Sequence, residues 1–423
     1  MLKQTILDAA NDPKELERLY RKAPGPFSKA LALALETVPD HLLLQAWHER
    51  LSPVEPPVSH PEAPPNPTIR SELGLALGLA IVATGIAKLP HFISNLPAER
   101  FYPPNLPAIA GIMFLTFFAV QRNVRPLSTC ALIATIVDVA VYLNFLPNPY
   151  QSDTSTLAMA HAPFFYWSLI GVAFLGGAWG QRSGRMDYLR FNGELLIHHT
   201  IIMTGGMVLT AVTIALFSLL NLRIDEWYMQ NIGLFGALAA PLVATLLITR
   251  VIKDRFRLAP LLAKTFSPLF LVMVSVYLIT ILVNRQSPFT DRGFLIAFNL
   301  LMGLVLGMSI LSISERKPDQ PINVFDSINL GLVAITLLVD MIALAAILFR
   351  LSSYGFTPNR IAVLGANLIV FCHLAGILYH YACFIKKRGK LITVETWIVR
   401  FLPLYSLWSL TVIIILPLLF GFA

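Results

Sequence analysis

The segment SINLGLVAITLLVDMIALAAILF, residues 327–349, indicates the fold class of this chain. It contains one charged side chain, that of Asp340. A helix of about 20 apolar residues crosses the ~30 Å hydrocarbon core of a bilayer, and a helix satisfies its own backbone hydrogen bonds there. We therefore predict a transmembrane helix in this segment.

Ten further segments have the same character. Of the 423 residues, 56% are hydrophobic and only 13% are charged, which excludes a soluble globular protein. We predict an all-α protein, a polytopic transmembrane bundle of about eleven spans. The predicted spans are 72–89, 105–121, 127–146, 161–180, 195–220, 231–249, 266–284, 293–313, 327–349, 360–383 and 397–420.

The N-terminal part of the chain differs in composition from the rest. Residues 1–51 have helical apolar patterns, with a helix start at Asn11-Asp12-Pro13 and a later helix from His41 to Leu51. Residues 52–71 are rich in proline and read as a semi-rigid linker. We predict three parts: a small cytoplasmic helical module at 1–51, a linker at 52–71 and the transmembrane domain at 72–423.

The distribution of charge argues against nucleic-acid binding and predicts the orientation in the membrane. The module is close to neutral, so the formal net charge of +8 resides in loops between apolar spans. With the N-terminus inside, the inner loops hold sixteen Lys and Arg residues and the outer loops hold six. Because basic loops remain cytoplasmic, we predict a cell inner membrane protein with a cytoplasmic N-terminus and a periplasmic or extracellular C-terminus.

Ionisable side chains within predicted spans are the main candidates for function, since each costs about 2.5–3.5 kcal/mol at the bilayer centre. Asp138, Asp340 and His373 are of this kind. Asp340 and His373 fall at similar depth on consecutive antiparallel helices, so we expect them to be close enough to touch. Such a pair fits either a proton-coupled solute site or a static pair that fixes helix register. Asp138 has no partner that the sequence identifies, although Asn144, and Asn299 or Asn329 on other spans, are available amides.

Three other histidines lie toward the predicted cytoplasmic side. His198 and His199 open the fifth span, and His380 approaches the inner end of the tenth. Histidines from two helices can hold a haem or a metal ion, but interfacial histidines are more often hydrated. We predict no cofactor and keep these three as weak candidate ligands.

Glycine positions suggest where the spans pack closely against one another. Gly74 with Gly78, and Gly303 with Gly307, form small-xxx-small pairs that favour close helix approach. We expect helices to approach one another at these two pairs.

The loop between the ninth and tenth predicted spans reads Arg350-Leu-Ser-Ser-Tyr-Gly-Phe-Thr-Pro-Asn-Arg360. It resembles the Tyr-Gly-hydrophobic-Thr-x-x-Arg element of the bacterial domain-of-unknown-function family 4153, as do Phe266-Ser-Pro-Leu-Phe270 and Tyr277. The resemblance spans residues 70–420 and implies a polytopic membrane fold with no stated activity. On physical grounds, Gly355 suits a positive φ, Thr357 a helix cap and Pro358 a helix start. Arg350 and Arg360 are candidates to contact a lipid phosphate or an anionic solute.

No established catalytic motif is present, so an enzyme is the less favoured class, although the absence of a motif does not exclude a membrane enzyme. We predict transport of a small solute or ion, with proton coupling through the intramembrane acid and histidine. The alternative is a signalling or assembly protein whose N-terminal module binds a cytoplasmic partner, and a third possibility is a membrane enzyme acting on a lipid-linked substrate. The expected partners are membrane lipids and a cytoplasmic protein, but not nucleic acid.

Overall fold

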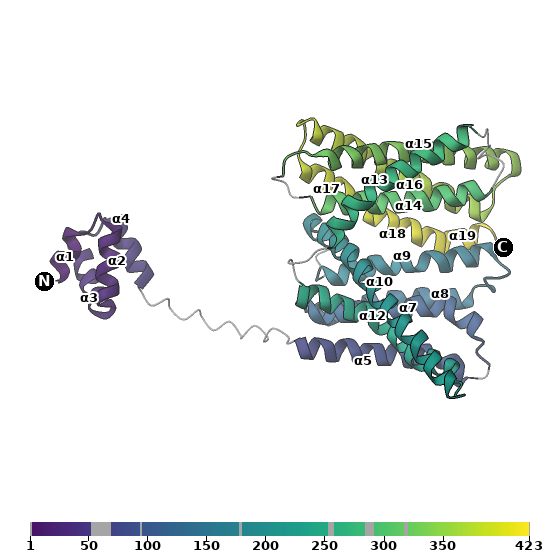
Figure 1. Ribbon diagram of the computed structural model, residues 1–423, viewed down its shortest axis with the longest axis horizontal. Coiled ribbons are helices and arrows are strands. Elements are labelled where there is room, and N and C mark those ends of the chain that lie inside the picture. Colours follow the sequence, from purple (N-terminus) through teal and green to yellow (C-terminus); the bar gives the residue numbers. More distant parts are fainter. Residues whose placement is uncertain are drawn as a thin grey trace. The chain divides into compact units, whose positions relative to one another are not determined.

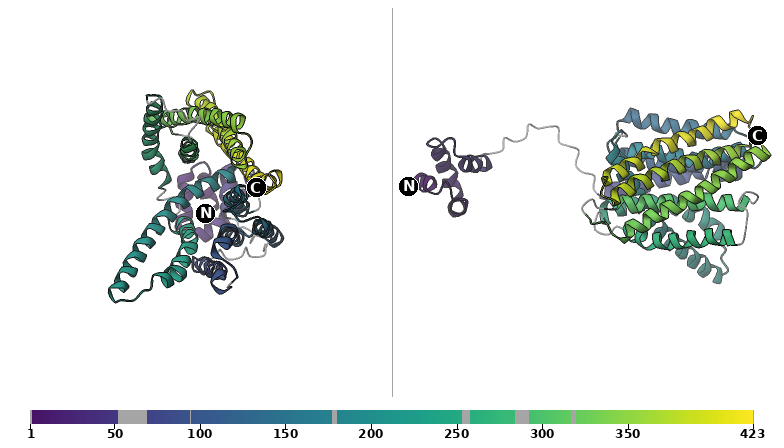
Figure 2. Two further views of the ribbon diagram at one scale, coloured as in Figure 1. Left: turned by 90° about the vertical axis from the view of Figure 1, so that its right-hand side faces the viewer. Right: turned by 90° about the horizontal axis from the view of Figure 1, so that it is seen from above.

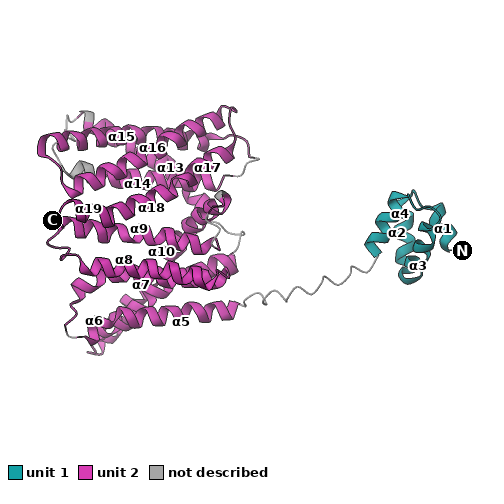
Figure 3. Cartoon of the chain, turned by 180° about the vertical axis from the view of Figure 1, so that it is seen from behind, with its two compact units in different colours: residues 1–66 teal, residues 67–423 magenta. Residues whose placement is uncertain are grey.

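The computed structural model describes residues 2–51, 69–93, 95–176, 180–252, 258–283, 292–316 and 320–422. These residues contain helices and no strands. The chain forms two compact units, Met1–Asn66 and Pro67–Ala423 (Figure 3). Residues 52–68 of the predicted linker lie outside the described residues, as do five of the counted loop cations, Lys253, Arg255, Arg257, Arg285 and Lys317.

The first unit is a bundle of four short helices. They are α1 (Leu2–Asp8), α2 (Pro13–Lys22), α3 (Pro24–Leu35) and α4 (Leu42–Leu51). Asp12 caps α2, as predicted, because its carboxylate accepts from the backbone N–H groups of Lys14 at 2.9 Å and Glu15 at 3.2 Å. The rings of Tyr20, Phe27 and Trp47 pack within 5.8 Å of one another at the centre of the unit. The first helix, α1, was not predicted.

The second unit, which we call the membrane unit, contains eleven helical segments long and apolar enough to cross a membrane within the described residues. This number confirms the prediction, and the protein is a multi-pass integral membrane protein. The first six segments are α5 (Ile69–Ala87), α7 (Ala98–Gln121), α8 (Pro126–Phe145), α9 (Asp153–Phe174), α10 (Arg182–Leu219), and the run of α11 (Asp225–Tyr228), η1 (Met229–Gly233), α12 (Leu234–Leu246) and η2 (Leu247–Ile252). The remaining five are α13 (Ala259–Val283), α14 (Arg292–Ser314), α15 (Val324–Tyr354), α16 (Pro358–Ile385), and the run of α17 (Leu391–Arg400), α18 (Leu402–Leu410), η3 (Thr411–Ile415) and α19 (Leu416–Leu419). A short helix, α6 (Leu89–Phe92), follows α5.

Two helix boundaries differ from the predicted ones for local reasons. Helix α5 begins at Ile69, so the last three residues of the predicted linker are helical. The fourth span begins at Asp153 rather than at 161, because the Ser152 side chain caps it by accepting from the Ser155 N–H at 3.1 Å. It ends before Gly176, whose φ of 64° breaks the helix.

Successive spans alternate in direction, so the unit has two faces. We call the face where α5 begins the proximal face and the face where the chain ends, beside α19, the distal face (Figure 1). One apolar core joins α5, α7, α8, α9 and α12. Two further clusters join α13 to α17. The membrane unit is therefore built as two groups of helices, and α10 contributes to the contacts of both.

Two ion pairs with buried carboxylates stabilise the membrane unit near the proximal face. The Arg250 guanidinium pairs with both oxygens of Glu72, which also accepts from Gln121 at 3.2 Å. Arg316 donates from Nε to Asp326 Oδ1 at 2.7 Å and from Nη2 to Oδ2 at 3.0 Å. These contacts link α5, α7 and η2 in one group, and they lock the α14–α15 connection in the other.

Helix α10 leaves the bundle on its way to the distal face. Its proximal half is packed, with Tyr188 buried and its hydroxyl donating to the Trp167 carbonyl at 2.8 Å. From about Ile201 onward its side chains are mostly exposed, including Val208, Leu209 and Leu219. Figure 2 (left) shows this half and the following helical segment as a hairpin whose tip projects from the unit, and α12 returns from the tip to pack on α5. In a bilayer, these apolar surfaces face lipid.

The glycines that allow close helix approach are not the predicted ones. A Cβ added at Gly74, Gly78, Gly303 or Gly307 would meet nothing within 4 Å, so that prediction was wrong. Instead, a Cβ at Gly365 would clash with the Trp408 ring and one at Gly376 with the Trp397 ring. Both glycines lie on α16, and both tryptophans lie on the run from α17 to α18. This helix pair is held by tryptophan rings against glycine backbone.

Candidate functional site

A cavity of about 860 Å³ lies between the two groups of helices, and we call it the central cavity. Its walls come mainly from α9, α10, α14, α16, α17 and α18, with most lining side chains apolar. No Asp, Glu, Lys or Arg lines it among the described residues. The polar side chains that line it are His161, Trp167, Ser168, Asn192, His199, His373, Tyr405, Trp408 and Ser409. An apolar pocket with a few polar groups is typical of sites that bind small organic molecules.

The cavity has an opening on the side of the unit. Phe164, near the middle of α9, is 63% exposed, and Leu196 of α10 is 68% exposed, although both line the cavity. Exposed apolar side chains at this depth in spanning helices face the hydrocarbon of the bilayer. The central cavity is therefore accessible from lipid.

Three aromatic side chains hold His373 in position. Its Nδ1 lies 2.9 Å from the Tyr405 hydroxyl, and its ring stacks on Phe401 with centroids 4.3 Å apart. Its backbone carbonyl accepts from Trp397 Nε1 at 3.1 Å. Its Nε2 is buried and has no hydrogen-bond partner among the described residues. The ring is thus fixed in place with one nitrogen available to a ligand or a proton.

Asp340 is fully buried on α15, and neither carboxyl oxygen has a hydrogen-bond partner within the described part of the chain. Asn329 and Thr336 lie on the same face of the helix, at spacings of seven and four residues, and both are buried; the Thr336 hydroxyl also has no hydrogen-bond partner among the described residues. An unsatisfied polar group in such surroundings costs several kcal/mol, so the polar side chains on this face of α15 lower the stability of the folded protein.

The expected contact between Asp340 and His373 is not formed as a hydrogen bond or an ion pair among the described residues. Instead, the Tyr405 hydroxyl lies 2.9 Å from His373 Nδ1. The reason is that the last transmembrane run packs against α16 and places a phenol at the histidine. Tyr405 was missed because an apolar span with one tyrosine gives no sign of which side chain that tyrosine meets.

The three histidines predicted to lie toward the cytoplasmic side, His198, His199 and His380, do not form a cluster. His198 is buried and its Nδ1 lies 2.9 Å from the Glu194 carbonyl, whereas His199 lines the central cavity. His380 packs against the rings of Tyr379 and Trp397. Among the described residues, no group of three or more His, Cys, Asp or Glu side chains is placed to hold a metal ion. A third histidine that lines the central cavity, His161, was not singled out in the sequence.

Asp138 lies on the exposed side of α8 and does not join the other candidates. Asn144, an amide that the sequence made available to it, pairs with Asn105 of α7 instead. The sequence could not reveal this, because it does not show which residues of α7 face α8. Asp138 is therefore a carboxyl group on the lipid-facing surface and outside the central cavity.

Arg350 and Arg360 do come together at the distal face. Both line a pocket of about 300 Å³, the distal pocket, with Asp153, Asn299, Thr357 and Asn359 among the other lining residues. Arg360 donates to the carbonyls of Tyr354 at 2.9 Å and Gly355 at 2.6 Å. Gly355 has φ 76°, the Thr357 hydroxyl caps α16 and Pro358 opens it, which confirms the predicted turn. The distal pocket carries both signs of charge, since Asp153 faces it too.

Comparison of the chain with protein-family models, curated proteins and solved structures finds no match.

Proposed function

We propose that the protein transports a small uncharged or amphipathic solute across the membrane, coupled to proton movement. The observation that carries this proposal is the central cavity, which is large enough for an organic molecule and uncharged at its described walls. His373 and Trp408 each offer it a buried ring nitrogen that has no hydrogen-bond partner in the described part of the chain. A hydrated inorganic ion would find few ligands there. We also propose, from its loop residues, that the chain belongs to family 4153.

The coupling group in this proposal is Asp340, acting together with Tyr405 and His373. A buried carboxyl without a partner changes its protonation when its surroundings become wetter or drier. If the cavity opens alternately to each side, the solute bound at His373 and the proton on Asp340 would influence each other through the Tyr405 phenol. Asp340→Asn keeps the volume and removes the titration.

The test uses the purified full-length protein in liposomes and measures proton-driven currents with a panel of uncharged and amphipathic metabolites. We expect a current with some member of the panel, no current in Asp340→Asn, and an unchanged amount of folded protein. A normal, pH-dependent current in Asp340→Asn would exclude the coupling. Lack of response to every compound, in the unmodified protein, would argue against transport.

A second variant tests the cavity itself. Gly307→Phe places a ring in the central cavity, where a Cβ meets nothing within 4 Å. Gly78→Phe is the matched control, since that glycine is equally open but lies on α5 outside the cavity. We expect loss of the current in Gly307→Phe and not in Gly78→Phe. Equal currents in both variants would show that the solute does not pass through this cavity.

Signalling is the second candidate function, and one observation favours it. Residues 1–66 form their own compact unit with their own core, and Leu42 at the start of α4 is 81% exposed. Such a unit is suited to bind a cytoplasmic protein. Removal of residues 1–68 should leave transport intact if the cycle occurs within the membrane unit, whereas a signalling output should be lost.

We also propose that the proximal face is cytoplasmic, on the basis of the sixteen to six distribution of basic residues. The odd number of spans then places the C-terminus in the periplasm or outside the cell. Alkaline phosphatase fused after residue 423 should be active. An inactive fusion, together with a fluorescent fusion at the same site that glows, would reverse the orientation.

A further inference from the structure

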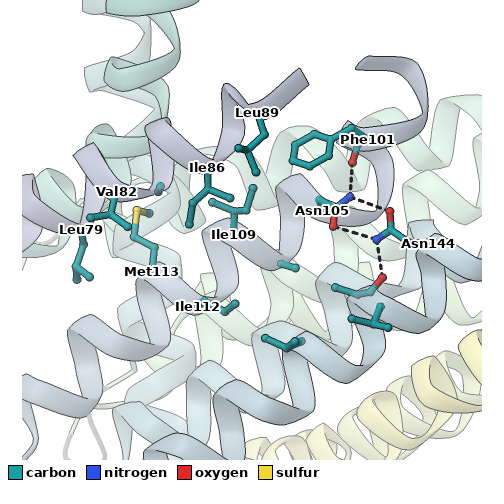
Figure 4. Close-up of a pocket in the computed structure, with 15 residues that line it drawn as sticks. Leu79, Val82, Ile86, Leu89, Phe101, Asn105, Ile109, Ile112, Met113 and Asn144 are labelled. Carbon is teal, nitrogen blue, oxygen red and sulfur yellow. Dashed lines mark hydrogen bonds between the residues drawn. The ribbon is translucent and has the colours of Figure 1, made fainter. Parts of the chain in front are cut away.

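A second concave surface of the membrane unit lies away from the central cavity, between α5, α7 and α8. This lipid-facing groove has a volume of about 310 Å³ and is lined almost entirely by aliphatic side chains (Figure 4). Val82 of α5 is 60% exposed and Val141 of α8 is 48% exposed, and both line it. Since all three helices span the membrane, the groove opens to lipid.

One end of the groove is polar. Asn105 of α7 and Asn144 of α8 face each other there and exchange hydrogen bonds at 3.1 Å and 3.0 Å (Figure 4). Asn105 lies near the distal start of α7, and Asn144 lies in the last turn of α8. The polar end is thus at the distal side, and the apolar walls extend toward the middle of the membrane.

The amide pair can accept hydrogen bonds but cannot donate more. The second N–H of Asn105 is given to the Phe101 carbonyl at 2.8 Å, and that of Asn144 to the Ala140 carbonyl at 2.8 Å. With both N–H groups used on each amide, only the side-chain oxygens retain capacity, one lone pair each. Flipping either amide would place an oxygen against a backbone carbonyl, so this orientation is fixed.

We propose that the lipid-facing groove binds the hydrocarbon chain of a membrane lipid whose polar end carries a hydroxyl donor. The hydroxyl would donate to the oxygens of Asn105 or Asn144, and the chain would lie along the aliphatic walls. A phosphate or carboxylate group would meet two carbonyl oxygens and no free N–H, so such head groups are disfavoured at this position. The polarity of the groove matches that of a lipid in the distal leaflet. This site is separate from the central cavity and does not rest on the transport proposal.

The experiment uses the full chain in liposomes with two photoactivatable probes. One probe is a long-chain alcohol with a diazirine in the chain, and the other is the methyl ester of the matched fatty acid, which has no donor. Cross-linked peptides are identified by mass spectrometry. We expect α5, α7 and α8 peptides to be labelled, and labelled about fivefold more by the alcohol, the preference that one net hydrogen bond provides.

Substitutions in the groove test the binding of the hydrocarbon chain and the hydrogen bond to the hydroxyl separately. Val82→Trp fills the groove and should abolish labelling by both probes, whereas Val208→Trp, equally exposed at 60% on α10, should leave labelling unchanged. The double variant Asn105→Leu with Asn144→Leu removes both partners together and should erase only the preference for the alcohol.

Equal labelling by alcohol and ester in the unmodified protein would overturn the proposed recognition. Labelling that persists in Val82→Trp would show that the probe sits elsewhere. Labelling that appears only after a co-purified protein has been removed would identify a partner helix as the natural occupant and would also overturn the proposal.

Discussion

Near the proximal face, ion pairs join α5 to η2, α14 to α15 and α10 to α17, whereas at the distal face the helices are joined, within the described residues, by single hydrogen bonds. The pairs Glu72–Arg250 and Arg316–Asp326 both lie toward the proximal end. At the distal end, the Asn359 amide donates to Asp153 at 2.7 Å, and the Ser152 hydroxyl donates to the Phe422 carbonyl at 3.0 Å. The distal half of α10 is mostly exposed, whereas α12 packs on α5 and the Lys88 Nζ donates to the Asn231 side-chain oxygen at 2.6 Å. We infer that the proximal end is the fixed part of the unit, and that any opening of the central cavity involves the distal part.

The largest effect is expected where an ion pair is both buried and proximal. Arg316→Ala leaves the Asp326 carboxylate buried with the Tyr381 hydroxyl and a backbone N–H but without its cation. Breaking a buried pair costs about 3–5 kcal/mol. The matched distal change, Arg360→Ala, removes two bonds to loop carbonyls and should cost about 1 kcal/mol. Unfolding of both variants in detergent by denaturant measures the difference, and equal losses would contradict the contrast between the two faces.

The same substitution on the two halves of α10 tests the contrast within one helix. Phe191 is buried and packs on Phe118 and Phe174 with ring centroids 5.5 Å and 5.1 Å away. Phe191→Ala should cost about 3–5 kcal/mol of unfolding free energy. Phe217, on the distal half, is 40% exposed, so Phe217→Ala should cost much less. A similar loss in both variants would mean that the distal half is packed in the membrane.

Gly376→Ala is expected to have a smaller effect, since it adds one carbon. That carbon would overlap the Trp397 ring, and overpacking typically costs about 1–3 kcal/mol. Gly303→Ala is the control, because its Cβ would enter open space and alanine favours a helix over glycine. Thermal unfolding of both variants measures how much stability the added methyl group removes at the α16–α17 contact. Gly376→Ala with unchanged stability would show that the tryptophan moves aside easily.

Sequence patterns predicted the number of spans and the capped turn at Gly355, Thr357 and Pro358 because these depend on local composition. They did not predict which residues meet. Asp340 and His373 were expected to touch because their depths match, but depth does not specify rotation about the helix axis, and Tyr405 occupies the position beside the histidine. The glycine pairs failed for the same reason, since a small residue favours close approach only on the face that a neighbour occupies.

The smallest effect on stability is expected for a solvent-exposed ion pair of the first unit, Glu17 with Arg21. Glu17 accepts from Arg21 Nε at 2.8 Å, and this bond holds the pKa of the carboxyl below its usual value of 4.5. Because the folded pKa is lowered, the stabilisation is present above pH 4.5 and is lost as the pH falls through the folded value. Hydrogen exchange of the α2 amides in the full chain should show slightly less protection in Glu17→Gln than in the unmodified protein at pH 7, and the difference should disappear in acid. A large difference at pH 7, or one that persists in acid, would show that Glu17 does more than pair with arginine on a solvated helix surface.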